Sequence, residues 1–98
     1  VATLFGTTGD DNISGTTVAD SILGNTGADT ITSLAGADTI NGNAGDDTII
    51  AGADGDRIRG GQDSDSILGE AGADIIFGDA AADTIDAGDD NDIVKGNA

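Results

Sequence analysis

Ten aspartates recur at nine-residue intervals along this 98-residue chain, and no other polar side chains are spaced so regularly. They are Asp11, Asp20, Asp29, Asp38, Asp47, Asp56, Asp65, Asp74, Asp83 and Asp92. The chain contains neither Cys nor His, so it can form no disulfide and lacks the ligands that zinc prefers. Hard carboxylate oxygens remain, and calcium binds such oxygens together with backbone carbonyls. The ten aspartates are therefore candidate calcium ligands.

Catalysis by the same acids is a weaker interpretation. Adjacent acids such as Asp10 and Asp11 could be compared with the carboxylate pair of a glycosidase, but no Trp or Tyr is present on which a sugar could stack. The Ser and Thr hydroxyls have no His or Cys to activate them as nucleophiles. We expect no enzyme activity. The remaining alternative is that each aspartate only closes its own turn through side-chain hydrogen bonds.

The aspartates belong to a nonapeptide repeat that fills the chain. An aliphatic residue follows each of them two positions later, from Ile13 to Val94, and a turn that contains glycine precedes each of them. Each repeat is predicted to be a six-residue turn followed by a strand of about three residues, with the middle strand residue pointing inward. Ten repeats run from residue 6 to residue 95, and Leu4 already occupies a strand position before them. We expect residues 1–98 to be a single array taken from a longer one.

Two repeats are needed to complete one coil, because a nine-residue unit cannot turn back and stack on itself. The sequence thus predicts an all-β fold, a parallel β-roll with two nonapeptides per 18-residue coil. The aspartates then form a first row (Asp11, Asp29, Asp47, Asp65, Asp83) and a second row (Asp20, Asp38, Asp56, Asp74, Asp92). Neighbouring carboxylates in a row would lie about 5 Å apart and repel each other unless cations lie between them. Each row has four gaps, so up to about eight Ca²⁺ ions are expected.

The pattern G-x-x-G-x-D-x-Ile-x, most complete at residues 24–32, 42–50 and 69–77, resembles the repeats-in-toxin (RTX) nonapeptide. The resemblance covers essentially the whole chain. It implies a right-handed parallel β-roll with calcium between successive turns. It also implies that backbone carbonyls of the turns join the aspartates as ligands. Candidate carbonyls are those of Gly6, Gly24, Gly42, Gly60 and Gly69.

The turn residues agree with this nonapeptide register, with a few exceptions. The second and fourth turn residues are expected to have positive φ, which glycine adopts freely and which Asn and Asp tolerate. Val18, Leu34 and Ala81 fit these positions poorly. We expect the turns at 15–20 and 78–83 to be the weakest in the array.

The composition also restricts the partners. A net charge of −16 leaves no basic surface for nucleic acid, and no stretch is apolar enough for a transmembrane segment. Arg57, Arg59, Ile75, Phe77 and Ile93 fall on one outer face and are the expected site of any protein contact, with end-to-end stacking as an alternative.

These features favour a non-catalytic, calcium-binding structural module of a secreted or cell-surface bacterial protein, which folds on binding calcium after export. By family resemblance, export would use type I secretion. A surface-layer (S-layer), adhesin or filament protein is the favoured parent. The alternative is a secretion and folding appendage of a protease, lipase or toxin. A third possibility is an ice-binding face, because one outer row is hydroxyl-rich: Asn12, Thr30, Thr48, Ser66 and Thr84.

Overall fold

The computed structural model describes residues 3–79, 81, 83–88 and 90–95, which form eleven β strands and no helix. The strands are β1 (Thr3–Phe5), β2 (Asn12–Ser14), β3 (Ser21–Leu23), β4 (Thr30–Thr32), β5 (Thr39–Asn41), β6 (Thr48–Ile50), β7 (Arg57–Gly61), β8 (Ser66–Leu68), β9 (Ile75–Asp79), β10 (Thr84–Asp86) and β11 (Ile93–Lys95). Since these residues contain no helix, they contain no helical span that could cross a membrane.

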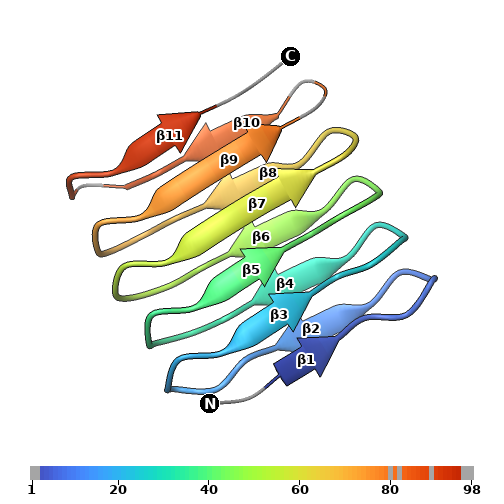
Figure 1. Cartoon of the computed structure of the whole chain (residues 1–98), viewed down its shortest axis with the longest axis horizontal. Coiled ribbons are helices and arrows are strands. Elements are labelled where there is room, and N and C mark those ends of the chain that lie inside the picture. The colour runs from blue at the N-terminus through green and yellow to red at the C-terminus, as the bar shows by residue number, and fades with distance from the viewer. Residues whose placement is uncertain (1–2, 80, 82, 89, 96–98) are drawn as a thin grey trace.

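The odd-numbered strands form a six-stranded front sheet and the even-numbered strands a five-stranded rear sheet (Figure 1). Neighbouring strands in each sheet are parallel and offset by one coil of 18 residues, as in the pairing of Ile22 with Ile40. Figure 1 shows the front strands running to the right and the rear strands returning to the left while the chain climbs, which is a right-handed coil. The predicted β-roll is confirmed.

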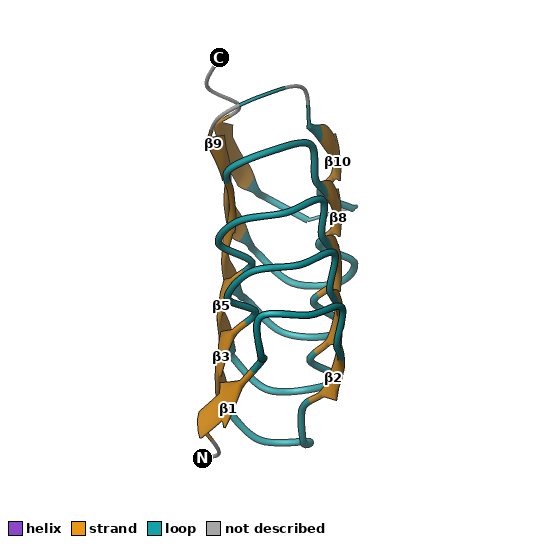
Figure 2. Cartoon of the chain, turned by 90° about the vertical axis from the view of Figure 1, so that its right-hand side faces the viewer, coloured by secondary structure: helices purple, strands orange, loops and turns teal. Residues whose placement is uncertain are grey.

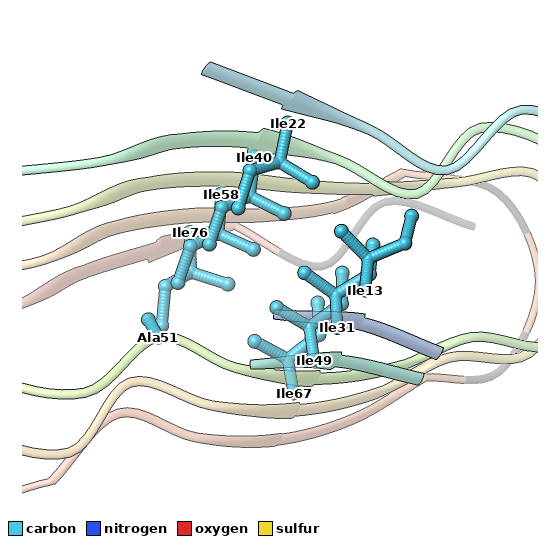
Figure 3. Packing of buried hydrophobic residues seen from close by; sticks show 9 residues of the cluster. All are labelled: Ile13, Ile22, Ile31, Ile40, Ile49, Ala51, Ile58, Ile67 and Ile76. Carbon is cyan, nitrogen blue, oxygen red and sulfur yellow. The ribbon is translucent and has the colours of Figure 1, made fainter. Parts of the chain in front are cut away.

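The core is a thin double row of isoleucines between the two sheets (Figure 3). The front sheet contributes Ile22, Ile40, Ile58 and Ile76, and the rear sheet contributes Ile13, Ile31, Ile49 and Ile67. Each is the middle residue of a short strand, or the second residue of the longer strands β7 and β9. The side view in Figure 2 shows the two sheets facing each other across this layer, and the molecule is only 13 Å thick. A layer this thin holds the sheets together and positions the turns at both edges.

Two strands are longer than the predicted three residues. Strands β7 and β9 each have five residues, because the parallel pairing continues as far as Gly61 and Asp79. The extension is accompanied by an ion pair in which Arg59 Nε donates to Asp79 Oδ2 at 3.2 Å. A cross-coil contact of this kind involves residues 20 positions apart, so the nonapeptide pattern alone does not reveal it.

Most turns have positive φ at their second and fourth residues, as expected. Leu34 and Ala81 adopt it despite their side chains, at 72° and 78°, whereas neither Thr16 nor Val18 does within the described turn 15–20. The backbone conformation of turn 15–20 therefore differs from that of the turns with positive φ at their second and fourth residues. Of the other turn expected to be weak, Ala80 and Ala82 lie outside the described residues. The relative strength of both turns remains a prediction.

Candidate metal centre

The two aspartate rows occupy opposite edges of the roll, where each turn stacks on the turn one coil away (Figure 1). Figure 2 looks onto the edge that carries the first row. The carboxylates point between the turns and not into water. Asp29, Asp38, Asp47, Asp56 and Asp74 are each only 1 % exposed, whereas Asp11, Asp83 and Asp92 towards the ends are half-buried.

One oxygen of each buried carboxylate holds two coils together. Asp29 N donates to Asp47 Oδ1 at 2.9 Å, and Asp47 N donates to Asp65 Oδ1 at 2.8 Å. The same bond recurs along both rows, up to Asp74 N, which donates to Asp92 Oδ1 at 2.7 Å. The stacking of successive aspartates is thus built into the backbone hydrogen bonding.

The second carboxylate oxygen has no such partner in most turns. The Oδ2 atom is buried and lacks a hydrogen-bond donor in Asp29, Asp38, Asp47, Asp56, Asp65, Asp74 and Asp83. A buried carboxylate oxygen without a donor is costly, because water has been removed and nothing replaces it. A cation between the turns would supply the missing interaction, so these residues fit a bound metal ion.

Backbone carbonyls face the same gaps. A Cβ built on Gly24 would lie 2.8 Å from the Gly42 carbonyl oxygen and 2.9 Å from Asp29 Oδ2. A Cβ built on Gly69 would lie 2.7 Å from the Ala87 carbonyl oxygen and 2.6 Å from Asp74 Oδ2. Glycine at the first turn position therefore leaves open a space bordered by a carboxylate of one coil and a carbonyl of the next.

The other predicted carbonyls have different surroundings. Those of Gly42 and Gly60 face the first glycine of the preceding coil, as does that of Gly24. For Gly69, it is the position of the missing Cβ that borders the gap beside Asp74. The Gly6 carbonyl accepts a hydrogen bond from Asn25 Nδ2 at 2.8 Å, so it already has a protein partner.

No three acidic side chains gather around one point in the part of the chain that the structure describes. Carbonyls would therefore have to supply most of the ligands of any ion. Calcium accepts this, since it takes 6–8 oxygen ligands from carboxylates and carbonyls alike.

The electrostatics of the metal-free rows are unfavourable. Burial, together with the charges of neighbouring aspartates, raises the pKa of Asp47 and of Asp56 to about 7. The same causes raise the pKa of Asp65 and of Asp74 to about 6. Burial likewise raises the pKa of Asp29 and Asp38 above the usual value. Positive charge between the turns would relieve this repulsion.

A family model described as the RTX calcium-binding nonapeptide repeat, in four copies, matches the chain in overlapping segments. The segments are residues 5–40, 14–49, 23–58, 33–67, 50–85 and 68–98. The chain belongs to this RTX family. As an RTX array, it is a calcium-binding structural module with about five coils. None of the curated proteins compared with this RTX array matches it.

Several acids outside the two rows also join coils, which the sequence analysis did not predict. Asp63 Oδ2 accepts a hydrogen bond from Gly45 N at 2.9 Å, and Asp46 Oδ1 accepts one from Ser64 N at 2.9 Å. Asp10, Asp54 and Asp90 make equivalent bonds. The sequence contains a signal for these bonds, because each of these acids lies 18 residues from the residue whose amide donates to it. In this RTX array such acids have a structural role that needs no metal.

Proposed function

We propose that this RTX array is a non-catalytic module of a secreted or cell-surface bacterial protein, and that it folds around calcium after export. The seven buried Oδ2 atoms without hydrogen-bond donors carry this proposal. The ten row aspartates, with turn carbonyls such as those of Gly24, Gly42 and Gly60, are the proposed ligands. Up to about eight ions would occupy the gaps between turns.

The proposed mechanism is coupled folding and binding. Without calcium, a chain with a net charge of −16 must bury like-charged carboxylates in order to fold, which favours extended conformations. Calcium removes that penalty, so that its binding free energy becomes folding free energy. Extracellular calcium modules work with Kd values of about 10⁻⁴–10⁻³ M, which would keep the array unfolded inside a cell and folded outside.

For the parent protein, we favour a surface-layer, adhesin or filament protein exported by type I secretion. A secretion and folding appendage of a protease, lipase or toxin is the alternative, and sequence flanking the array would distinguish the two. We do not propose ice binding. The hydroxyl-rich row is in register and exposed, but the neighbouring row pairs Ile50 with Leu68 and Leu68 with Asp86, which breaks its regularity.

We further propose that any protein partner contacts the front sheet. The pairing places Ile75 between Arg57 and Ile93, and Arg59 CZ lies 5.7 Å from the centre of the Phe77 ring. Lys95 also pairs with Phe77, so all three basic residues of the chain stand beside apolar side chains on this face. A partner with acidic and apolar groups would suit it. End-to-end stacking of arrays is the alternative contact.

The test is far-UV circular dichroism during calcium titration of chelator-treated protein, with magnesium as the control cation. We expect a cooperative gain of β structure with calcium alone, because Mg²⁺ requires a tighter octahedral site and gives up its water reluctantly. A β spectrum that responds to neither calcium nor chelator would contradict the proposal.

A further inference from the structure

The first turn of each row, residues 6–11 and residues 15–20, differs from the other turns. In the turns that follow, the second residue has positive φ, as in Asn25 at 68° and Asn43 at 68°. Thr7 and Thr16 occupy the same position and do not have positive φ. Their backbone amides consequently point towards the aspartate of their own turn.

Both threonines donate to the carboxylate oxygen that has no donor in the later turns. Thr16 N donates to Asp20 Oδ2 at 2.6 Å, and Thr16 Oγ1 lies 2.9 Å from Asp20 Oδ1 and 3.0 Å from Asp20 Oδ2. Thr7 repeats this arrangement, with its amide on Asp11 Oδ2 and its Oγ1 3.0 Å from each Asp11 oxygen. An amide and a hydroxyl of the same residue thus approach one carboxylate.

In the next coil, the aspartates have no such donors at Oδ2. Asp29 and Asp38 follow Asp11 and Asp20 in their rows, and each has a buried Oδ2 with no donor. At the second position of those turns, Asn25 donates its Nδ2 to the Gly6 carbonyl, and Leu34 has no side-chain donor to offer. The Ser33 hydroxyl lies near the Asp38 carboxylate and interacts with it, but it donates its hydrogen bond to the Ala51 carbonyl, and Asp38 Oδ2 has no donor. The Asp38 oxygen therefore stays available.

We propose that Thr7 and Thr16 replace calcium in the first gap of each row. Calcium then binds in the other gaps, each of which lies between one aspartate and the next aspartate of its row. These gaps follow Asp29, Asp47 and Asp65 in the first row and Asp38, Asp56 and Asp74 in the second. This makes six ions in place of the eight that the repeat count suggests. The Asp83 oxygen is not counted, because the far side of its gap lies outside the described residues. This inference rests on the proposed calcium-binding function and refines it.

The physical reason is competition for the same oxygens. In a first gap, an ion must displace the threonine donors before it gains the carboxylate, whereas in the later gaps it meets an oxygen that has no other partner. Affinity of calcium sites depends on how many charged oxygens are free to bind and on the rigidity of the site. The first gaps should therefore bind calcium much more weakly than the other six.

The chain offers matched variants. Replacing both threonines, Thr7→Gly and Thr16→Gly, removes the hydroxyls and allows the positive φ that Gly52 and Gly61 have at the same turn position, 90° and 96°. The control pair, Thr8→Gly and Thr17→Gly, adds the same flexibility to the same turns at residues that do not contact the carboxylates. Thr7→Ser with Thr16→Ser keeps both hydroxyls.

The experiment counts bound ions by native mass spectrometry and calorimetry of the 98-residue chain with increasing calcium. We expect six ions for the wild type, the control pair and the serine pair, and about eight for the glycine pair. Eight equivalent ions in the wild type, or no gain in the glycine pair, would overturn this inference while leaving the proposed function intact. A chain that binds no calcium would overturn both.

Discussion

Each carboxylate of the buried rows serves two purposes with its two oxygens. In Asp47, Oδ1 accepts the Asp29 amide at 2.9 Å and fixes one coil on the next, whereas Oδ2 is buried and has no donor. The first oxygen is structural, and the second is available to a cation. An amide side chain can replace the first function but not the second, because Asn keeps one oxygen and loses the charge.

Asp47→Asn should therefore have opposite effects with and without calcium. We expect the calcium concentration at the folding midpoint to rise about tenfold, since one charged ligand is lost. In chelator, the same variant should have more β structure than the wild type, because a buried charge has been removed. Calcium titration followed by circular dichroism measures both effects.

Asp46→Asn is the matched control for this substitution. Asp46 is the neighbouring acid, is exposed, and accepts the Ser64 amide through Oδ1, an acceptor that Asn retains. The control should leave the calcium midpoint close to that of the wild type. An equal rise in both variants would mean that the midpoint depends on net charge and not on the buried oxygen.

The raised pKa values predict how the metal-free chain responds to pH. The pKa of Asp47 and Asp56 is about 7 in the fold against an ordinary value of 3.8, so ionisation costs more in the folded state than in the unfolded state. The stability of the metal-free roll is therefore greatest below about pH 4 and falls as pH rises through the range from about 4 to 7. Circular dichroism in chelator should show more β structure at pH 4.5 than at pH 8.

Calcium should reverse the direction of this pH dependence. A bound ion favours the ionised carboxylate, so protons and calcium compete, and acid should weaken the calcium-loaded roll. The calcium midpoint should rise as pH falls from 7 to 5. If the metal-free chain instead gained structure on going to pH 8, the buried rows would not be what opposes its folding.

In the strands, nine of the ten repeats place one isoleucine at the inward position of a core only two residues wide, and the tenth has Val94 there. Ile49 in β6 is completely buried and pairs with Ile31 and Ile67 in the adjacent coils. Ile49→Ala should lower the free energy of unfolding of the calcium-loaded roll by about 2–5 kcal/mol, because the thin layer has little else to fill the cavity. Urea unfolding at saturating calcium measures the change.

The adjacent residue provides the control for this element. Ile50 has the same side chain in the same strand, but it lies on the outer face and is only half-buried. Ile50→Ala should cost about 1 kcal/mol or less. Comparable losses for the two variants would mean that the alternation of inward and outward residues does not determine the stability of the strand.

The repeated elements could be predicted from the sequence because each rests on a local rule. An aliphatic residue two positions after each aspartate predicts the inward isoleucine, and the 18-residue coil predicts the register of both sheets. The exceptions depend on contacts between coils. Strand β9 extends to Asp79 with an Arg59 contact from the coil before, and no rule within one nonapeptide contains that information.

The candidate site was predictable in position but not in detail. The nine-residue spacing places the aspartates in rows, yet it does not say which oxygen of each carboxylate has a donor. Thr7 and Asn25 occupy equivalent turn positions and both have polar side chains. Only the backbone conformation, with positive φ at Asn25 and not at Thr7, decides which of them reaches its own aspartate.

Over the molecule as a whole, the acids that we propose as calcium ligands repel one another when calcium is absent. The folded roll has a radius of gyration of 11.7 Å, close to the value of about 13 Å expected for a compact domain of this length. An unfolded chain of the same length would have a radius of about 31 Å. A net charge of −16 around a core only two side chains wide favours the unfolded state when calcium is absent.

Small-angle scattering should therefore show a contraction from about 30 Å in chelator to about 12 Å in millimolar calcium. Sodium chloride at matched ionic strength is the essential control, because screening alone reduces the repulsion between exposed charges. Screening cannot supply the oxygens of the buried rows with a partner, so salt and magnesium should leave the chain expanded. If sodium chloride compacted the chain as far as calcium does, the contraction would reflect general screening, and the gaps between turns would not be the switch.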